Sequence, residues 1–441
     1  MVQNKALCLI TYGCQMNKYD SETIMGILSD YSLTNEPKEA NLILINTCAV
    51  RQHAEDKVYS LLGRLGMVKH NKPNLKIGIC GCLAEQYGDK LLKKFPALDL
   101  VLGPDHIFKL SDLLDKLYKG EKIVLTGHKS KSVTTLPTKR VDSIRAYIPI
   151  VLGCNNYCSY CVVPYTRGNI RSREPHEILN EVKNLVELGY QEVTLLGQNV
   201  NDYGVDFKNQ KINFLKLLIM LNEISPLKRI RFITSHPKNF SNELVDALPQ
   251  LKKVCEYIHL PIQSGSNKIL KLMNRGYTVE FYQQLVDYIR QKIQNVSITT
   301  DLIVGFPGEE EDDFNQTLNA VKEIRFDSAF TFKFSPRPNT KSATYPNQVP
   351  EDVKQDRLKK LIDITTRITK EKNQELIGKI EEILIEGKNP KDPSFLMGRT
   401  RTDKIVFPKA TGNSLIGKLT NVKIISCGTH SFKAQLIGDK H

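Results

Sequence analysis

Short apolar runs alternate with amphipathic stretches through most of this sequence, and no other feature limits the possible folds as strongly. Parallel neighbouring strands need a crossover connection, usually a helix, and strands buried on both faces are apolar throughout. In residues 1–125 the apolar runs are ALCLITYG, NLILINT, KIGICG and DLVLG, and a helical pattern follows each of them. We therefore predict a doubly wound parallel sheet with helices on both faces, within an α/β multidomain chain.

Residues 145–370 repeat this alternation with six strand candidates. These are RAYIPIVLG, EVTLLGQN, RIRFITSHP, YIHLPIQSG, SITTDLIVGFPG and SAFTFKFSP. A closed barrel of this kind needs eight strand–helix units, so six units predict a partial (β/α)6 barrel. The polar and basic residues 126–144 between the two regions are predicted to form a linker.

Residues 371–441 have a different pattern. Short runs of strand-forming residues, KIEEILIEG, KIVFP, LTNVKIISC and SFKAQLIG, are separated by Gly, Pro and Asn. Short strands with frequent turn signals predict a small C-terminal β-barrel. At about 150 residues per domain, a chain of 441 residues accommodates three such domains.

The charge balance favours a polyanionic partner. Sixty-two Lys and Arg residues against 48 Asp and Glu residues give a net charge of +14. Between positions 129 and 173 there is one acid, Asp142, and there are eight basic residues: Lys129, Lys131, Lys139, Arg140, Arg145, Arg167, Arg171 and Arg173. A basic surplus of this size suits nucleic acid above all, although net charge alone is equally compatible with a basic protein that has no such partner.

The composition does not suggest a membrane-spanning or secreted protein. The mean hydropathy is -0.30. No apolar run approaches the ~18 residues of a membrane span, and the start MVQNKALCLITYGC lacks the pattern of a signal peptide. We therefore expect a cytoplasmic protein with no membrane partner, whose ten cysteines are reduced thiols. Clusters of reduced cysteines are typical of metal ligands or catalytic groups.

The segment GCNNYCSYC holds Cys154, Cys158 and Cys161 in a C-x3-C-x2-C spacing, directly after the first strand of the central domain. A compact loop with this spacing can bring three thiolates to one metal centre. Three protein ligands leave a coordination position open, which is typical of a catalytic site. The alternative is a structural zinc site, but His176, the nearest histidine downstream, lies outside the loop at the start of a predicted helix.

A second set of cysteines is regular over a longer range. Cys14, Cys48 and Cys82 are 34 residues apart each time, and each follows a predicted strand. Loops after successive parallel strands share one rim of a sheet, where doubly wound folds bind ligands. We therefore predict a second three-cysteine site; the alternative is that these cysteines are ordinary small apolar residues at strand ends. The other cysteines that we predict to be structural are Cys8, Cys80, Cys255 and Cys427.

The chain resembles the radical S-adenosylmethionine methylthiotransferase family over essentially all of its length. The C-x3-C-x2-C loop after the first barrel strand is similar to the superfamily signature, and further motifs include TYGCQMNKYDSE, NTCAVRQHAEDKVYSLLGRL, LLGQNVNDYG, HLPIQSGSNKILKLMNRGY and TDLIVGFPGE. The last segment, with GRTRTDK, resembles the TRAM domain, an RNA-binding β-barrel. Within the family, QMN after Cys14 resembles the members that act on N6-isopentenyladenosine.

This resemblance implies a tRNA-modifying enzyme with two [4Fe-4S] clusters. The C-x3-C-x2-C cysteines would bind the cluster at which S-adenosylmethionine is cleaved to a 5′-deoxyadenosyl radical. The three early cysteines would bind an auxiliary cluster that carries sulfur. The radical would remove the C2 hydrogen of N6-isopentenyladenosine at position 37 of tRNA, where a methylthio group then attaches. Two S-adenosylmethionine molecules would be used per turnover.

Polar positions at the ends of the barrel strands are expected to contact the cofactor, because this fold places its ligands there. Tyr160, inside the cysteine loop, is expected beside the adenine of S-adenosylmethionine. The other expected contacts are Gln198, Asn199, Ser235, Gln263, Ser264, Arg275, Asp301 and Val304. Each of these positions is equally compatible with plain loop structure.

RNA contacts are expected after the cysteine loop and in the TRAM-like segment, where basic side chains would meet phosphates of the anticodon stem-loop. The residues concerned are Arg167, Arg171, Arg173, Arg399, Arg401 and Lys404. The other implied partners are an electron donor such as flavodoxin or ferredoxin, and a protein that supplies sulfur or iron–sulfur clusters. A monomer is expected, because the sequence contains no coiled-coil repeat.

Two alternative functions stay open on the sequence alone. One is a methylthiotransferase with another acceptor, either threonylcarbamoyladenosine in tRNA or an aspartate of a ribosomal protein. The other is a non-catalytic iron–sulfur protein that binds RNA and does not cleave S-adenosylmethionine.

Overall fold

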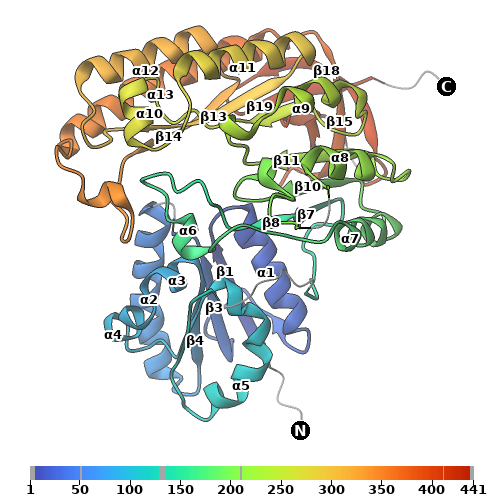
Figure 1. The fold of residues 1–441 in the computed structure, drawn as a ribbon. Coiled ribbons are helices and arrows are strands. Elements are labelled where there is room, and N and C mark those ends of the chain that lie inside the picture. Colours follow the sequence, from blue (N-terminus) through green and yellow to red (C-terminus); the bar gives the residue numbers. More distant parts are fainter. Residues whose placement is uncertain (1–4, 50–51, 129–135, 209–210, 411, 438–441) are drawn as a thin grey trace.

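The computed structural model describes residues 5–49, 52–128, 136–208, 211–410 and 412–437. It contains a parallel sheet at the N-terminus, a central half-barrel and a closed C-terminal barrel (Figure 1). The predicted fold class, an α/β multidomain chain, is therefore confirmed. In the part of the chain that is described, no helix is both long and apolar enough to cross a membrane.

The N-terminal sheet has six parallel strands in the order β2-β1-β3-β4-β5-β6. The strands are β1 (Ala6–Tyr12), β2 (Ser32–Leu33), β3 (Leu42–Thr47), β4 (Lys76–Gly81), β5 (Leu100–Leu102) and β6 (Ile123–Leu125). The sequence predicted β1, β3, β4 and β5. It missed β2 and β6, which form the two edges of the sheet and are too short to show any periodicity.

Helices cover both faces of this sheet, as a doubly wound fold requires. On one face α1 (Gln15–Ile27), the 3-10 helix η1 (Pro104–Lys109) and α5 (Leu110–Tyr118) pack against Leu7, Leu42 and Leu100. On the other face α2 (Gln52–Asn71), α3 (Cys82–Tyr87) and α4 (Asp89–Lys94) pack against Ile43, Ile45 and Ile77. Cys8 and Cys80 belong to these two cores, so their prediction as buried strand residues is confirmed.

The central half-barrel contains all six predicted strands, paired in parallel as β7-β10-β11 and β12-β13-β14. A bridge between Ile230 and Val254 connects the two halves. The strands are β7 (Arg145–Pro149), β10 (Glu192–Leu196), β11 (Arg229–Ile233), β12 (Tyr257–His259), β13 (Ser297–Val304) and β14 (Ser328–Lys333). The α-helices are α6 (Val163–Thr166), α7 (Pro175–Glu187), α8 (Phe214–Asn222), α9 (Asn242–Ala247), α10 (Asn267–Leu272), α11 (Val279–Lys292) and α12 (Glu311–Ile324). The short 3-10 turns are η2 (Val200–Asp202), η3 (Pro237–Asn239), η4 (Leu248–Gln250) and η5 (Lys341–Thr344).

A long helix, α13 (Glu351–Gln374), passes through the predicted boundary at residue 370 and leads into the C-terminal barrel. The barrel closes in the order β15-β16-β17-β19-β18 around Ile383, Val406 and Phe432. Its strands are β15 (Ile380–Lys388), β16 (Leu396–Thr400), β17 (Ile405–Pro408), β18 (Leu419–Cys427) and β19 (Ser431–Leu436).

Arginine–carboxylate pairs join the N-terminal domain to the rest of the chain. Four such pairs are Arg140–Glu22 at 2.8 Å, Arg167–Asp20 at 2.5 Å, Arg171–Asp105 at 2.9 Å and Arg337–Glu55 at 3.0 Å. Most of these side chains are less than one-tenth exposed, so each charge depends on its partner. Removing one partner from such a buried pair costs about 3–5 kcal/mol, which makes this contact a fixed interface.

The backbone conformation at one position of the N-terminal sheet, Gly81, requires glycine. Gly81 has φ +93° and ψ -163°, a region that is essentially restricted to glycine, and a Cβ there would lie 2.5 Å from the carbonyl oxygen of Thr47. We predict that Gly81→Ala lowers the stability of the chain by about 1–3 kcal/mol. Thermal melting of the apoprotein measures this loss.

Gly63 provides the matched control, because a Cβ at this exposed position of α2 meets nothing within 4 Å. Gly63→Ala should therefore stabilise the chain by about 0.5–1 kcal/mol through a less flexible unfolded state and better helix propensity. Equal melting temperatures for the two variants would contradict the argument.

Candidate functional site

The cysteine loop, residues 153–162, connects β8 (Val151–Leu152) to α6. β8 pairs antiparallel with β9 (Arg171–Ser172), which follows α6 and closes the base of the loop. Gly153 has φ +77°, and a Cβ on it would lie 2.1 Å from the carbonyl oxygen of Asn169. The side chain of Gln198 accepts a hydrogen bond of 2.6 Å from the Gly153 amide. The loop is therefore held at the carboxyl end of the half-barrel by the backbone conformation of Gly153 and by the hydrogen bond from Gly153 to Gln198.

Each sulfur of this loop lies in a distinct environment. Asn156 donates to the Sγ of Cys154 at 3.4 Å, and the guanidinium of Arg275 donates to the Sγ of Cys158 at 3.4 Å. Burial, followed by the charge of the neighbouring Cys158, raises the pKa of Cys161 to about 12. A buried thiol of this kind gives up its proton readily only when a metal ion binds the sulfur or a base accepts the proton.

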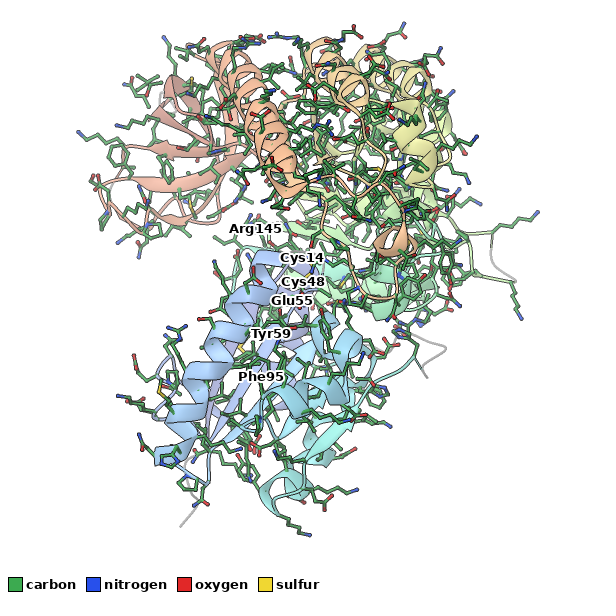
Figure 2. All side chains as sticks on the ribbon, turned by 90° about the vertical axis from the view of Figure 1, so that its left-hand side faces the viewer. Cys14, Cys48, Glu55, Tyr59, Phe95 and Arg145 are labelled. Atoms are coloured by element: carbon green, nitrogen blue, oxygen red, sulfur yellow. The ribbon has the colours of Figure 1, made fainter. Side chains whose placement is uncertain are left out.

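The second three-cysteine site lies at the rim of the N-terminal sheet, where Figure 2 labels Cys14 and Cys48. Cys14 caps α1 after β1, Cys48 follows β3, and Cys82 begins α3 after β4. These three strands are neighbours, and their last residues Tyr12, Thr47 and Gly81 are in register. Cys14 hydrogen-bonds with Cys48, and this bond is the main reason that the pKa of Cys14 falls to about 6. The register therefore places the three cysteines at one rim of the sheet, and their joining in one cluster site stays a prediction.

A buried polar network supports this rim from below. The backbone N–H of Cys14 donates to the side-chain oxygen of Asn17 at 3.2 Å, and Asn17 donates to Asn46 at 3.1 Å. Asn46 in turn donates to Ser21 at 2.9 Å. Asn17 and Asn46 are fully buried, so the hydrogen bonds fix the start of α1 against β3.

Arg167 connects the two sites. It follows α6, six residues after Cys161, and its Nε donates to the Sγ of Cys82 at 3.3 Å. Its guanidinium also pairs with Asp20 on α1 at 2.5 Å. In Figure 1, α6 lies on top of the N-terminal domain, where it packs against α3. The segment that follows the cysteine loop therefore contacts the rim that carries Cys82, across the junction of the domains.

The donor set of each site suits an iron–sulfur cluster, because cysteine thiolates are the usual ligands of such clusters. Among the described residues, no group of three or more His, Cys, Asp or Glu side chains is arranged to hold a single metal ion. Three cysteines per site, with arginine and asparagine donors to the sulfurs, match what such a cluster needs.

Three of the expected cofactor contacts face the loop or carry free polar atoms. Arg275 donates to Cys158, to the Tyr160 hydroxyl at 3.5 Å and to the Pro261 carbonyl at 2.8 Å. Within the described part of the chain, the hydroxyl of Ser235 and the side-chain oxygen of Gln263 are buried and accept no hydrogen bond. Gln263 also has φ +74°, a strained backbone of the kind found at ligand sites. Tyr160 packs edge-on against Phe306.

The other expected contacts have intramolecular partners. Asn199 bonds Asn239 at 3.2 Å and accepts from the His236 amide, and Ser264 bonds Thr317 at 3.3 Å. Asp301 lies 3.5 Å from His259, and Val304 is fully buried in the core. Contact with the cofactor stays a prediction for these residues and for Gln198, which supports Gly153.

Sequence reasoning missed His236. Its ring is buried and packs against Tyr277, its Nδ1 accepts from the Lys238 amide, and its Nε2 has no partner among the described residues. Burial, followed by the charge of Arg275, lowers the pKa of His236 to about 2, so the ring is neutral. A histidine before proline at the end of a predicted barrel strand was the available signal.

The arginines that were expected to bind RNA have carboxylate partners within the chain. Arg167 and Arg171 pair with acids of the N-terminal domain, and Arg173 pairs with Glu181 at 2.8 Å. These three side chains are at most one-tenth exposed, whereas the side chains of a phosphate-binding surface are open to solvent. Lys129 and Lys131, from the same basic segment, lie outside the described residues.

The basic residues of the TRAM-like segment also have partners within the chain. Arg401 binds Glu256 of the central domain with two contacts of 2.7 Å. Arg399 binds Glu386 of β15 in the same barrel at 3.2 Å, and Lys404 donates to Asn373 of α13 at 2.8 Å. RNA contact stays a prediction for these three residues.

Three families match successive parts of the chain. The Radical SAM superfamily matches residues 148–321, the Uncharacterized protein family UPF0004 matches residues 6–103, and the TRAM domain matches residues 374–437. Among solved structures, the fold is similar to TsrM, a radical S-adenosylmethionine methyltransferase from Kitasatospora setae. The TM-score is 0.56 at 14% sequence identity, and the match covers 77% of each chain.

Curated relatives match the chain from end to end. The chain is 47% identical to the tRNA-2-methylthio-N(6)-dimethylallyladenosine synthase of Caldicellulosiruptor saccharolyticus, over 99% of this chain and 93% of that protein. It is 46% identical to the enzyme of the same name from Thermodesulfovibrio yellowstonii, over 99% of this chain and 100% of that protein. With its two cysteine sites and its closed C-terminal barrel, the chain belongs to the radical S-adenosylmethionine methylthiotransferase family.

Proposed function

We propose that this chain is a tRNA methylthiotransferase, which converts N6-isopentenyladenosine at position 37 to 2-methylthio-N6-isopentenyladenosine. The observation that carries the proposal is the pair of three-cysteine sites, which Arg167 joins across the domain boundary. One site suits radical generation and the other suits sulfur delivery, so a chain with both can attach sulfur to an unreactive C–H carbon. The end-to-end similarity to named synthases supports the same acceptor.

The cofactors are two [4Fe-4S] clusters and S-adenosylmethionine, which together supply the radical, the sulfur and the methyl group. We assign the first cluster to Cys154, Cys158 and Cys161, and the auxiliary cluster to Cys14, Cys48 and Cys82. The chain's own contribution is to hold the thiolates in place. Asn156 and Arg275 do this for the loop, while the buried network under Cys14 does it for the rim.

S-adenosylmethionine is proposed to lie between the loop and the strand ends of the half-barrel. The polar atoms of Ser235 and Gln263 support this position, because they are buried without partners in the described chain and a ligand would satisfy them. Tyr160 and Arg275 form the wall beside Cys158.

The outer face of the C-terminal barrel is the surface that we propose for tRNA. Phe407 and Lys433 lie opposite each other on β17 and β19, while their neighbours Val406 and Phe432 fill the barrel core. A hollow of about 370 Å³ is lined by Phe407, Lys433 and Phe395. A phenylalanine ring beside a lysine suits an unstacked base and its phosphate. This face differs from the ion-paired one that holds Arg399 and Arg401.

The three domains divide this work in our proposal: residues 1–125 carry the auxiliary cluster, 145–370 the radical chemistry and 371–441 the tRNA contact. The enzyme works as a monomer in the cytoplasm, where its tRNA substrate is found. It receives electrons from a donor such as flavodoxin or ferredoxin, and a sulfur or cluster supply protein restores the auxiliary site.

Replacing Cys14, Cys48 and Cys82 together by Ala should reduce the iron content from about eight to about four atoms per chain after anaerobic reconstitution. The C-x3-C-x2-C loop is untouched, so the variant should still produce 5′-deoxyadenosine under reducing conditions. Replacing Cys154, Cys158 and Cys161 should remove a similar amount of iron and abolish that product. Full iron content in either variant would contradict the assignment of the cysteines.

Nucleoside mass spectrometry tests the acceptor. Expression of the chain in a bacterial strain without its own synthase should restore 2-methylthio-N6-isopentenyladenosine in hydrolysed tRNA, and the Cys154→Ala variant should not. If sulfur appeared instead on threonylcarbamoyladenosine or on a ribosomal protein, the acceptor named here would be wrong.

Phe407→Ala combined with Lys433→Ala should weaken tRNA binding. Loss of one stacked base costs about 1–3 kcal/mol, or roughly 5- to 150-fold in Kd, and loss of one phosphate contact lowers the salt slope by about 1. Lys359→Ala, which removes an exposed charge on α13, is the control and should leave binding unchanged. Equal affinities of the double variant and the wild type in filter binding would count against this face.

A further inference from the structure

Arg167 is in an unusual position for a side chain of the central domain. It follows the helix after the loop of Cys154, Cys158 and Cys161, yet its guanidinium contacts a cysteine of the other domain. The distance from Nε to the Sγ of Cys82 is 3.3 Å, and the residue is only 4% exposed. A charged donor held against a sulfur in a dry environment stabilises negative charge on that sulfur strongly.

The same guanidinium is fixed by a carboxylate that belongs to the cysteine rim. Asp20 lies on α1, the helix that Cys14 caps, and it accepts from Nη2 of Arg167 at 2.5 Å and from Nη1 at 3.5 Å. Asp20 is 7% exposed, so it is also shielded from solvent. The carboxylate orients the guanidinium and offsets part of its charge at the sulfurs.

The backbone of Arg167 is held as firmly as its side chain. Arg171 donates to the carbonyl oxygen of Arg167 at 2.9 Å, while its own guanidinium forms two contacts of 2.9 Å with Asp105 of the N-terminal domain. The arginine therefore cannot leave Cys82 without disturbing a second ion pair between the domains.

We propose that Arg167 and Asp20 together set the reduction potential of the auxiliary cluster, with Arg167 as a positioning residue on Cys82. This inference rests on the proposed function, because it takes Cys14, Cys48 and Cys82 as the ligands of that cluster. Hydrogen bonds to ligand sulfurs and local net charge are two of the means by which a protein tunes such a cluster. Arg167 favours the reduced, more negative cluster and raises its potential, whereas Asp20 moderates this effect.

Replacing either residue should shift the midpoint potential, and the two shifts should be in opposite directions. A purely structural role of the two residues would not produce opposite shifts. Arg167→Gln removes the positive donor and should lower the midpoint potential of the auxiliary cluster. Asp20→Asn keeps the volume of the side chain but removes the opposing charge, and it should raise the midpoint potential. The double variant should lie between the two single variants.

The measurement is a redox titration followed by electron paramagnetic resonance. It uses the full chain with Cys154, Cys158 and Cys161 replaced by Ala, so that only the auxiliary cluster contributes to the signal. Arg140→Gln is the matched control, because it breaks a buried pair of the same interface that reaches Glu22 instead of a cysteine and makes no contact with Arg167 in the described chain. We expect this control to leave the midpoint potential unchanged. The iron released to a chelator, measured in parallel, should increase in Arg167→Gln.

Two results would overturn the inference. One is a shift of the same sign in Arg167→Gln and Asp20→Asn, and the other is an equal shift in Arg167→Gln and Arg140→Gln. If Arg167→Gln does not fold, Asp20→Asn still decides the matter, because an unchanged or lower potential in that variant contradicts the proposal. A background protein that binds no cluster at all would instead overturn the proposed function, so the two failures are distinguishable.

Discussion

The whole arrangement depends on buried arginine–carboxylate pairs between the N-terminal domain and the central domain. The arginines Arg140, Arg167 and Arg171 lie before and after the cysteine loop. Their partners Glu22 and Asp20 lie on α1, the helix that Cys14 caps, and Asp105 lies on η1. Charges this deep in the protein have no good alternative partner, because little water reaches them. Separating such a pair inside the protein would lower the stability of the fold by several kcal/mol. The interface therefore has one favourable arrangement, and it holds the segment that follows the cysteine loop against the sheet rim that carries Cys82. The proposed chemistry, with a radical formed at one site and sulfur delivered from the other, requires such a fixed arrangement.

The fold was largely predictable because it follows from periodicity. Every strand of the half-barrel appeared as an apolar run, and the 34-residue spacing of Cys14, Cys48 and Cys82 placed all three at one rim, as the register of β1, β3 and β4 confirms. The edge strands β2 and β6 were not visible, since two or three residues carry no period and their pairing is decided by the neighbouring strand.

The surroundings of the site were less predictable, because they depend on contacts between distant parts of the chain. Arg167 and Asp20 are 147 positions apart, and Arg231 reaches the backbone of Arg401 across 170 positions. No local window shows such a pairing, so a run of basic residues resembles a nucleic-acid surface whether or not acids elsewhere bind it. The same limit applies to Ser235 and Gln263. Sequence position suggested them, but only the burial of their polar atoms without partners sets them apart from Asn199 and Ser264.

The two cysteine sites also differ in how the chain assembles them. Cys154, Cys158 and Cys161 lie within eight consecutive residues, so their proximity needs no pairing of distant strands. The early trio meets only after three strands have paired, and pairing at long sequence separation is slow because the intervening chain must first give up its freedom. Under the proposed assignment, assembly of the auxiliary cluster at the sheet rim therefore waits for the N-terminal fold, whereas the ligands at the loop are near one another from the start.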